Sequence, residues 1–206
     1  YAPDLPPVLN DITIHARPGE FIAIVGPSGA GKSTIARLLL GFDTPESGGI
    51  YYGGMDMSTV NRRDLRKQIG TVLQGGGLIQ ASIYENIAGA SGISLNDAWE
   101  AARQAGCADD IRAMPMGMHT AVHNGAVSGG QRQRLLISRA LARNPRVIIF
   151  DEATSALDNE TQAHVADSLD RLNATRIVIA HRLSTIIHAD RIYVLDAGHI
   201  VQTGTF

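Results

Sequence analysis

The chain has 206 residues, of which 44% are hydrophobic and 18% are charged, and its formal net charge is −2. These values are typical of a globular protein with one large domain or a core with an inserted subdomain, and they argue against a broadly basic nucleic-acid-binding surface. The single cysteine, Cys107, cannot form an internal disulfide, which fits a reducing compartment. No apolar run approaches the length of about 18 residues expected of a membrane span. We expect Tyr1 and Phe206 to be cuts within a longer protein.

The N-terminal part contains the most specific motif of the chain. Ile12 and Ile14 alternate with polar residues and predict edge strands, followed by a turn at residues 18–19. An apolar run over residues 21–25 predicts a buried strand, and residues 35–40 predict a helix. Between these two elements lies the sequence GPSGAGKST. In the context of a strand and a helix, the pattern GxxxxGK[ST] predicts a phosphate-binding loop.

Each residue type in this loop has a physical role. Glycines let consecutive backbone N–H groups converge on one anion, and the start of the helix adds unpaired N–H groups and a positive dipole. Lys32 is expected to reach the β- and γ-phosphates of a nucleotide, and the Ser33 hydroxyl is expected to ligate Mg²⁺. A chance Gly-rich match is the competing interpretation. The predicted nucleotide-binding residues of the loop are Gly26, Pro27, Ser28, Gly29, Ala30, Gly31, Lys32, Ser33 and Thr34.

The next elements are short. Residues 50–52 predict a strand that ends at the turn Gly53-Gly54, and the polar stretch 61–67 predicts a short helix. Residues 69–73 predict another strand, with Gln74 at its end.

A helical block follows, because no strand signal appears between Gly75 and Arg146. We therefore expect residues 78–143 to form a helical insertion in an α/β domain. Its apolar residues repeat at helical spacing in Leu95, Ala98, Trp99 and Ala102. We interpret Trp99 as a packing anchor of this insertion rather than as a base-stacking residue.

The C-terminal part returns to alternating strands and helices, which imply a mainly parallel sheet. Residues 147–150 are β-branched and aromatic, which is typical of a strand buried on both faces. Further strands are expected over 177–180 and 192–195, and Asp158 is expected to cap a helix that runs to Leu172.

Two carboxylates follow the strand over residues 147–150, at the edge where ligands bind in open α/β sheets. Asp151 can hold Mg²⁺, and Glu152 can polarise a water for attack on the γ-phosphate. The competing interpretation is that the pair merely caps the next turn. His181, at the end of the strand over 177–180, is predicted to contact the γ-phosphate, with a structural histidine as the alternative.

A second helix start carries glycines. The sequence Ser128-Gly129-Gly130-Gln131 precedes a helical stretch over residues 132–143. A serine hydroxyl and bare glycine amides at a helix start can bind an anion, whereas an ordinary cap is the alternative for an isolated motif. Two phosphate-binding helix starts in one chain suggest that one nucleotide is held between two chains.

Together these motifs resemble the nucleotide-binding domain of ATP-binding-cassette transporters, over essentially the whole chain. The matching pieces are GPSGAGKST (26–34), VLQ (72–74), SGGQRQR (128–134), VIIFDEATSALD (147–158) and IAHRLSTI (179–186). The resemblance implies an α/β fold with a RecA-like P-loop NTPase core, a mainly parallel sheet and an antiparallel β edge. It assigns residues 1–77 and 144–206 to this core and residues 78–143 to an inserted α-helical subdomain. The implied cofactors are ATP and Mg²⁺.

The resemblance also implies roles for residues of the site. Tyr1 would stack on adenine, Gln74 would contact Mg²⁺ and sense the membrane domain, and Asp158 would help to align two chains. The implied Mg²⁺ ligands are Ser33, Gln74 and Asp151, the last directly or through water. Lys32, Glu152 and His181 would be catalytic, whereas Ser128, Gly129, Gly130 and Gln131 would face the ATP of the partner chain.

EATSALD and AHRLSTI resemble exporters, and residues 78–118 resemble ATPases that export bacteriocins or peptides. The implied protein dimerises around ATP and drives export of a bacteriocin, peptide, lipid or drug at the cytoplasmic face of a bacterial inner membrane. Its partners would be a second nucleotide-binding domain and transmembrane domains fused upstream of Tyr1, with no nucleic acid, and the isolated domain would be soluble. Residues 120–127 depart from the exporter pattern, because they lack a glutamate, are about two residues short and end in Val127 instead of leucine.

Two other functions compete. A cassette ATPase of DNA repair or translation would share the phosphate chemistry, but the chain has no sustained heptads between the phosphate loop and Asp151 and no basic excess. A nucleoside kinase with a phosphate loop would not explain the SGGQ sequence, and a phosphoacceptor assay would distinguish it.

Overall fold

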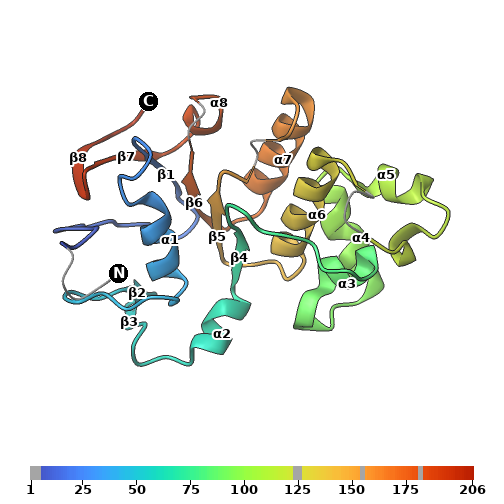
Figure 1. The fold of residues 1–206 in the computed structure, drawn as a ribbon, viewed down its shortest axis with the longest axis horizontal. Coiled ribbons are helices and arrows are strands. Elements are labelled where there is room, and N and C mark those ends of the chain that lie inside the picture. The colour runs from blue at the N-terminus through green and yellow to red at the C-terminus, as the bar shows by residue number, and fades with distance from the viewer. Residues whose placement is uncertain (1–5, 123–126, 154–155, 181–182) are drawn as a thin grey trace. The chain divides into compact units, whose positions relative to one another are not determined.

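The computed structural model describes residues 6–122, 127–153, 156–180 and 183–206. The chain forms two compact units (Figure 1). The first comprises the chain up to Lys67, Ile149–Asp151 and the chain from Thr175 onward, and the second comprises Gln68–Ile148 and Glu152–Ala174. The division into a core and an insertion at residues 78–143 stays a prediction.

The first unit is built on strand β1 (Phe21–Val25), whose FIAIV sequence is buried over its first four residues. β1 pairs in parallel with β6 (Thr175–Ile179) on one side and with β7 (Arg191–Asp196) on the other. Strand β8 (His199–Gly204) is antiparallel to β7. A mainly parallel sheet with an antiparallel edge is thus confirmed.

The complete sheet has the order β4-β5-β6-β1-β7-β8. Strand β5 (Val147–Asp151) is shared between the units, since its last three residues belong to the first and its first two to the second. Within the second unit, β5 lies next to β4 (Ile69–Val72). In β5 the residues Ile148, Ile149 and Phe150 are buried, as the sequence predicted for this strand, whereas Val147 at its start is half-buried.

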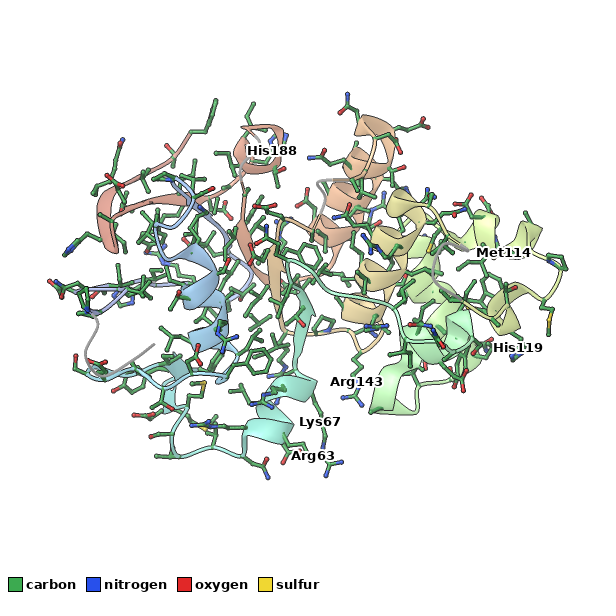
Figure 2. The ribbon with its side chains drawn as sticks, in the orientation of Figure 1. Arg63, Lys67, Met114, His119, Arg143 and His188 are labelled. Carbon is green, nitrogen blue, oxygen red and sulfur yellow. The ribbon has the colours of Figure 1, made fainter. Side chains whose placement is uncertain are left out.

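Helix α1 (Lys32–Leu39) follows β1 through the phosphate loop. Beyond it come the hairpin β2 (Tyr51–Tyr52) and β3 (Met55–Asp56), then α2 (Arg62–Lys67), which buries none of its residues. Figure 2 shows the side chains of Arg63 and Lys67 projecting from α2. Arg66 Nε of the same helix donates to the Leu40 carbonyl at the end of α1, over 3.1 Å. A short helix, α8 (Leu183–Ile186), precedes β7.

The second unit packs helices around α6 (Gly129–Leu141), which contacts α3 (Ile83–Ala88), α4 (Leu95–Gln104) and β4. Helix α5 (Ala108–Ala113) and the 3₁₀ turns Gly89–Ser91 and Gly117–His119 complete this part of the unit. Helix α7 (Asn159–Arg171) lies against α4, where a His164 ring nitrogen is 2.9 Å from the Arg103 carbonyl. No helix in the described part of the chain has the length and apolar character needed to cross a membrane.

Two local expectations in this unit are confirmed. Asp158 caps α7, because its side chain accepts a hydrogen bond from the Thr161 amide. Trp99 is half-buried and the guanidinium of Arg112 stacks over its ring at 5.2 Å, so it serves packing within the unit.

One expected element is absent, because residues 12–14 form no strand. The backbone amides on either side of these residues form hydrogen bonds that are not part of a β-sheet. The Asn10 amide donates to the Gly198 carbonyl, and the His15 amide donates to the Tyr193 hydroxyl. Asp11 adopts a left-handed φ of 51°, which interrupts an extended chain. Ile12 and Ile14 are still half-buried between exposed neighbours, so the alternation reflects burial without strand pairing.

Candidate nucleotide-binding site

The phosphate loop lies between β1 and α1 and depends on its glycines. Gly26 has φ 152°, and a Cβ there would lie 2.0 Å from the Leu195 carbonyl oxygen. Gly31 has φ 105°, and a Cβ there would lie 2.5 Å from a methyl group of Leu9. An L side chain at either position would strain the backbone and collide with a neighbour, so the chain itself requires both glycines.

Lys32 lies within this loop and is 6% exposed. Its Nζ donates hydrogen bonds to the carbonyl oxygens of Gly26 and Pro27, each over 2.8 Å. Burying an ammonium group is costly unless it is hydrogen-bonded, and these contacts fix the charge at the centre of the loop. A cation held there by backbone carbonyls is suited to a phosphate anion.

Ser33 and Asp151 meet although 118 positions separate them in the sequence. The Ser33 hydroxyl donates to an Asp151 carboxylate oxygen over 2.9 Å, and Asp151 is 5% exposed. A hydroxyl beside a buried carboxylate offers the hard oxygen ligands that Mg²⁺ prefers. The residues present therefore fit a Mg²⁺ ion next to the phosphate loop.

Glu152 follows directly in the chain and belongs to the second unit. Its backbone is left-handed, with φ 55°. One of its carboxylate oxygens lies 3.4 Å from the side-chain amide nitrogen of Gln74, which is the second residue after β4. The structure thus brings Glu152, the predicted general base, next to Gln74, a predicted Mg²⁺ ligand.

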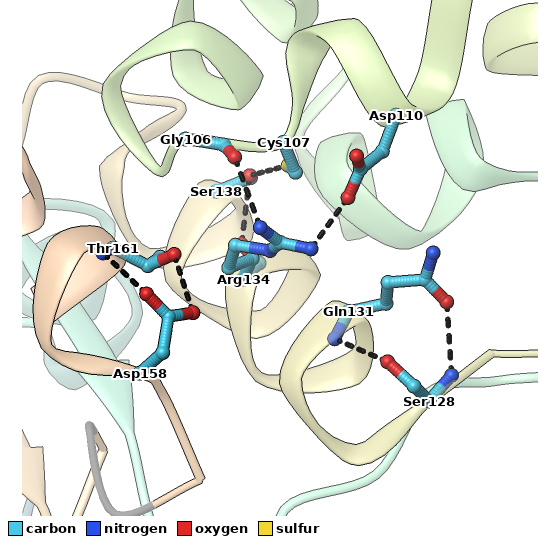
Figure 3. A network of polar contacts seen from close by, with 9 residues as sticks. All are labelled: Gly106, Cys107, Asp110, Ser128, Gln131, Arg134, Ser138, Asp158 and Thr161. Carbon is cyan, nitrogen blue, oxygen red and sulfur yellow. Dashed lines mark hydrogen bonds and ion pairs between the residues drawn. The ribbon is translucent and has the colours of Figure 1, made fainter. Parts of the chain in front are cut away.

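The start of α6 carries the SGGQ sequence, as Figure 3 shows. The Ser128 side chain accepts a hydrogen bond from the Gln131 amide over 3.2 Å, and the Ser128 amide donates to the Gln131 side chain over 2.9 Å. This reciprocal capping box lets the helix begin at Gly129, three residues earlier than the predicted stretch. Neither glycine of the motif adopts a left-handed φ, and the site of a Cβ on Gly129 is open space.

Asp158 and Arg134 lie near this helix start in Figure 3. Hydrogen bonds from the Thr161 amide and hydroxyl lower the pKa of the Asp158 carboxyl, and the charge of Arg134 contributes. Arg134 itself donates to the Asp110 carboxylate and to the Gly106 carbonyl. These contacts favour the ionised form of Asp158, which caps α7.

Two expected site residues, Tyr1 and His181, lie outside the described residues, as does half of the departing loop over 120–127. The roles assigned to the other site residues stay predictions. Sequence reasoning missed Gln133, whose side chain forms hydrogen bonds with the Glu152 carbonyl and the Ala156 amide. Its position two residues beyond Gln131, inside the quoted SGGQRQR motif, was the available signal.

Residues 9–155 match the ABC transporter family, and the chain belongs to it. The alpha-hemolysin translocation ATP-binding protein HlyB of Escherichia coli O157:H7 is 48% identical, over all of this chain and 30% of that protein. The leukotoxin export ATP-binding protein LtxB of Aggregatibacter actinomycetemcomitans is 44% identical, over 99% of this chain and 30% of that protein. The chain therefore spans about a third of the length of these relatives.

A solved structure supports the same assignment. A bacterial Atm1-family ABC exporter with ATP bound has a TM-score of 0.92 and 42% identity to this chain, over 96% of this chain and 36% of that one. The predicted family and fold are thereby confirmed. These similarities favour the exporter over the DNA-repair, translation and kinase alternatives.

Proposed function

We propose that this chain binds and hydrolyses ATP as the engine of a membrane exporter. The observation that carries the proposal is the cluster of Lys32, Ser33 and Asp151, in which a buried ammonium lies in a Gly-rich loop and a hydroxyl is hydrogen-bonded to a buried carboxylate. This combination suits a triphosphate with its metal ion better than a simple anion.

The chemistry follows from the same residues. Bound Mg²⁺ would neutralise charge on the phosphates, and Ser33 and Asp151 are the residues that would hold it. Lys32 would bind the β- and γ-phosphates, and Glu152 would accept a proton from the attacking water. Gln74, which contacts the Glu152 carboxylate, would report the state of this site to a membrane domain.

Dimerisation and transport are properties of a whole exporter, and this chain covers only about 30% of the length of its relatives. We therefore include both in the proposal. A second nucleotide-binding domain would complete each site with its Ser128–Gln131 segment, and Asp158 would help to align the pair. Transmembrane domains, which in the proposed exporter lie upstream of Tyr1, would place the assembly at the cytoplasmic face of a membrane. The names of the relatives favour a translocated toxin as cargo, whereas the bacteriocin class expected from residues 78–118 stays a prediction.

Substitution of the proposed base tests the hydrolytic step. Glu152→Gln keeps the shape of the side chain and removes its basic oxygen, so steady-state ATP turnover should fall by about 10²–10⁴-fold. Calorimetric ATP affinity should remain, and the variant should accumulate as an ATP-bound dimer in size-exclusion chromatography. Turnover near that of the wild type would show that Glu152 is a structural cap.

Mixing two inactive variants tests whether the sites are shared. Lys32→Ala lacks the phosphate-loop cation, and Gly130→Asp places an anion where the partner's γ-phosphate would lie. A mixed dimer rebuilds one complete site, so mixing should restore part of the turnover, with native mass spectrometry to verify that mixed dimers form. A wild-type/Lys32→Ala dimer has one intact site under either geometry. If that dimer is active while the two-variant mixture stays inactive, each site lies within one chain.

A further inference from the structure

Gln133, in the second turn of α6, uses both ends of its side-chain amide on one short segment. Its Nε2 donates a hydrogen bond to the Glu152 carbonyl over 3.2 Å, and its Oε1 accepts one from the Ala156 amide over 2.7 Å. The side chain is half-buried, and all three residues belong to the second unit. Gln133 thus connects the helix that begins with SGGQ to the backbone that leaves β5.

The backbone at Glu152 is in a conformation that needs such support. A φ of 55° is sparsely populated for a residue with a long side chain, and it persists only where surrounding contacts fix it. The peptide that carries the Glu152 carbonyl is the group that Gln133 binds. Because this carbonyl carbon is bonded to the Glu152 Cα, a shift of the peptide would displace the Cα and move the carboxylate relative to Gln74.

The neighbouring residue provides a contrast. Arg134 donates to the Asp110 carboxylate and to the Gly106 carbonyl, so its contacts join α6 to α5 and to the loop before α5. Gln133 instead bonds to the Glu152 carbonyl and the Ala156 amide. Packing of the helical layer and support of the Glu152 backbone are therefore divided between adjacent residues of α6.

We propose that Gln133 is a positioning residue for ATP hydrolysis: from the helix that begins with SGGQ, it fixes the Glu152 peptide and so aims the Glu152 carboxylate at the attacking water. This inference rests on the proposed function, because it acts through Glu152 as the general base. Gln133 touches no reacting atom, and its effect belongs to the hydrolytic step and not to ATP binding.

The first test separates the two hydrogen bonds in the purified chain. Gln133→Leu removes both, whereas Gln133→Glu keeps an acceptor for the Ala156 amide and loses the donor to the Glu152 carbonyl. Both variants should lower kcat by about 10- to 100-fold, since small misplacements of reacting groups have effects of this size. Calorimetric ATP affinity and the stoichiometry of bound ATP should not change, which excludes loss of folded protein as the cause.

Gln104→Leu is the matched control, because Gln104 is a helical glutamine of the same unit whose amide donates to the Glu100 carboxylate on its own helix. Its kcat should equal that of the wild type. If Gln133→Glu also retains wild-type kcat while Gln133→Leu loses it, the bond to Ala156 carries the effect and the proposal is overturned.

A double-mutant cycle with Glu152→Gln decides whether Gln133 acts through Glu152. If it does, Gln133→Leu should add no further loss to the residual single-turnover rate of Glu152→Gln. Full multiplication of the two losses would overturn the proposal while leaving the proposed base in place. Wild-type turnover of Glu152→Gln alone would instead refute the base assignment in the proposed function, and the role of Gln133 with it.

Discussion

The two glycine-containing helix starts of this chain use glycine for different reasons. At α1 the N-cap is Gly31 with φ 105° and no side chain caps the helix, whereas at α6 Ser128 and Gln131 form a complete capping box. In the phosphate loop a Cβ on Gly26 would collide with the Leu195 carbonyl, but one on Gly129 would meet nothing. The first loop needs its glycines to fold.

At the start of α6, Gly129 is not required by a left-handed φ or by a close neighbour within the chain. Gly129 lies in an ordinary helical position with open space around it, where alanine would be the better helix former. A helix start that satisfies its own backbone and still keeps bare glycines presents a surface that another molecule can approach closely. The contrast supports an assignment of α1 to the chain's own nucleotide and of α6 to the nucleotide of a partner.

The largest expected effect distinguishes the two helix starts by charge. Lys32→Ala removes a buried ammonium from the α1 site, and loss of a charged hydrogen-bonding group of this kind should weaken ATP binding by about 10- to 100-fold. Isothermal titration calorimetry with ATP measures the change. Lys67→Ala is the control, since Lys67 pairs with Asp64 on exposed α2, and it should leave the affinity unchanged. Equal affinities for both variants would remove Lys32 from phosphate binding.

A steric prediction comes next in size. Gly26→Ala forces a Cβ to within 2.0 Å of a backbone oxygen, and the overpacking should lower the free energy of unfolding by about 1–3 kcal/mol. Gly29→Ala is the matched variant, because Gly29 has a left-handed φ of 81° but no neighbour within 4 Å. It should lose about 1 kcal/mol from backbone strain alone. Urea unfolding compares them, and a larger loss in Gly29→Ala would contradict the steric argument.

Much of this organisation could be predicted from the sequence, because it depends on local patterns. The apolar runs of β1 and β5 indicate buried strands, and the rule that ligands bind at strand ends anticipates that Asp151 lies near the phosphate loop. Asp158 is recognisable as a cap because capping joins residues three positions apart.

The features that sequence reasoning missed depend on distant partners. The stretch with Ile12 and Ile14 looks like a strand, but the backbone beside it bonds to Tyr193 and Gly198, about 180 positions away. Gln133 looks like one more polar residue of a helix, because nothing in a helical pattern says that its amide will meet the Glu152 backbone. Pairing of this kind is set by tertiary packing, which periodicity does not encode.

The third prediction concerns the capping box of α6. Ser128→Ala removes the acceptor for the Gln131 amide and should cost about 1 kcal/mol in unfolding free energy. Ser94→Ala is the matched control, since Ser94 forms the same reciprocal box with Asp97 at the start of α4. Both variants should lose similar stability in urea unfolding, but only Ser128→Ala should lose ATP turnover. Equal turnover in the two variants would make SGGQ an ordinary helix cap.

The last prediction has the smallest effect on stability, and it distinguishes folding from function because the variant should be more stable but less active. Gly129→Ala fills open space in a helix with an ordinary φ, so unfolding free energy should rise by about 0.5–1 kcal/mol through reduced entropy of the unfolded chain. The added methyl group would also keep a partner's nucleotide from the backbone, so ATP turnover should fall. Gly77→Ala, at another open position without a left-handed φ, should leave turnover unchanged. A Gly129→Ala variant that is more stable and fully active would mean that nothing approaches α6 closely, and the assignment of its first turn to a partner's nucleotide would be wrong.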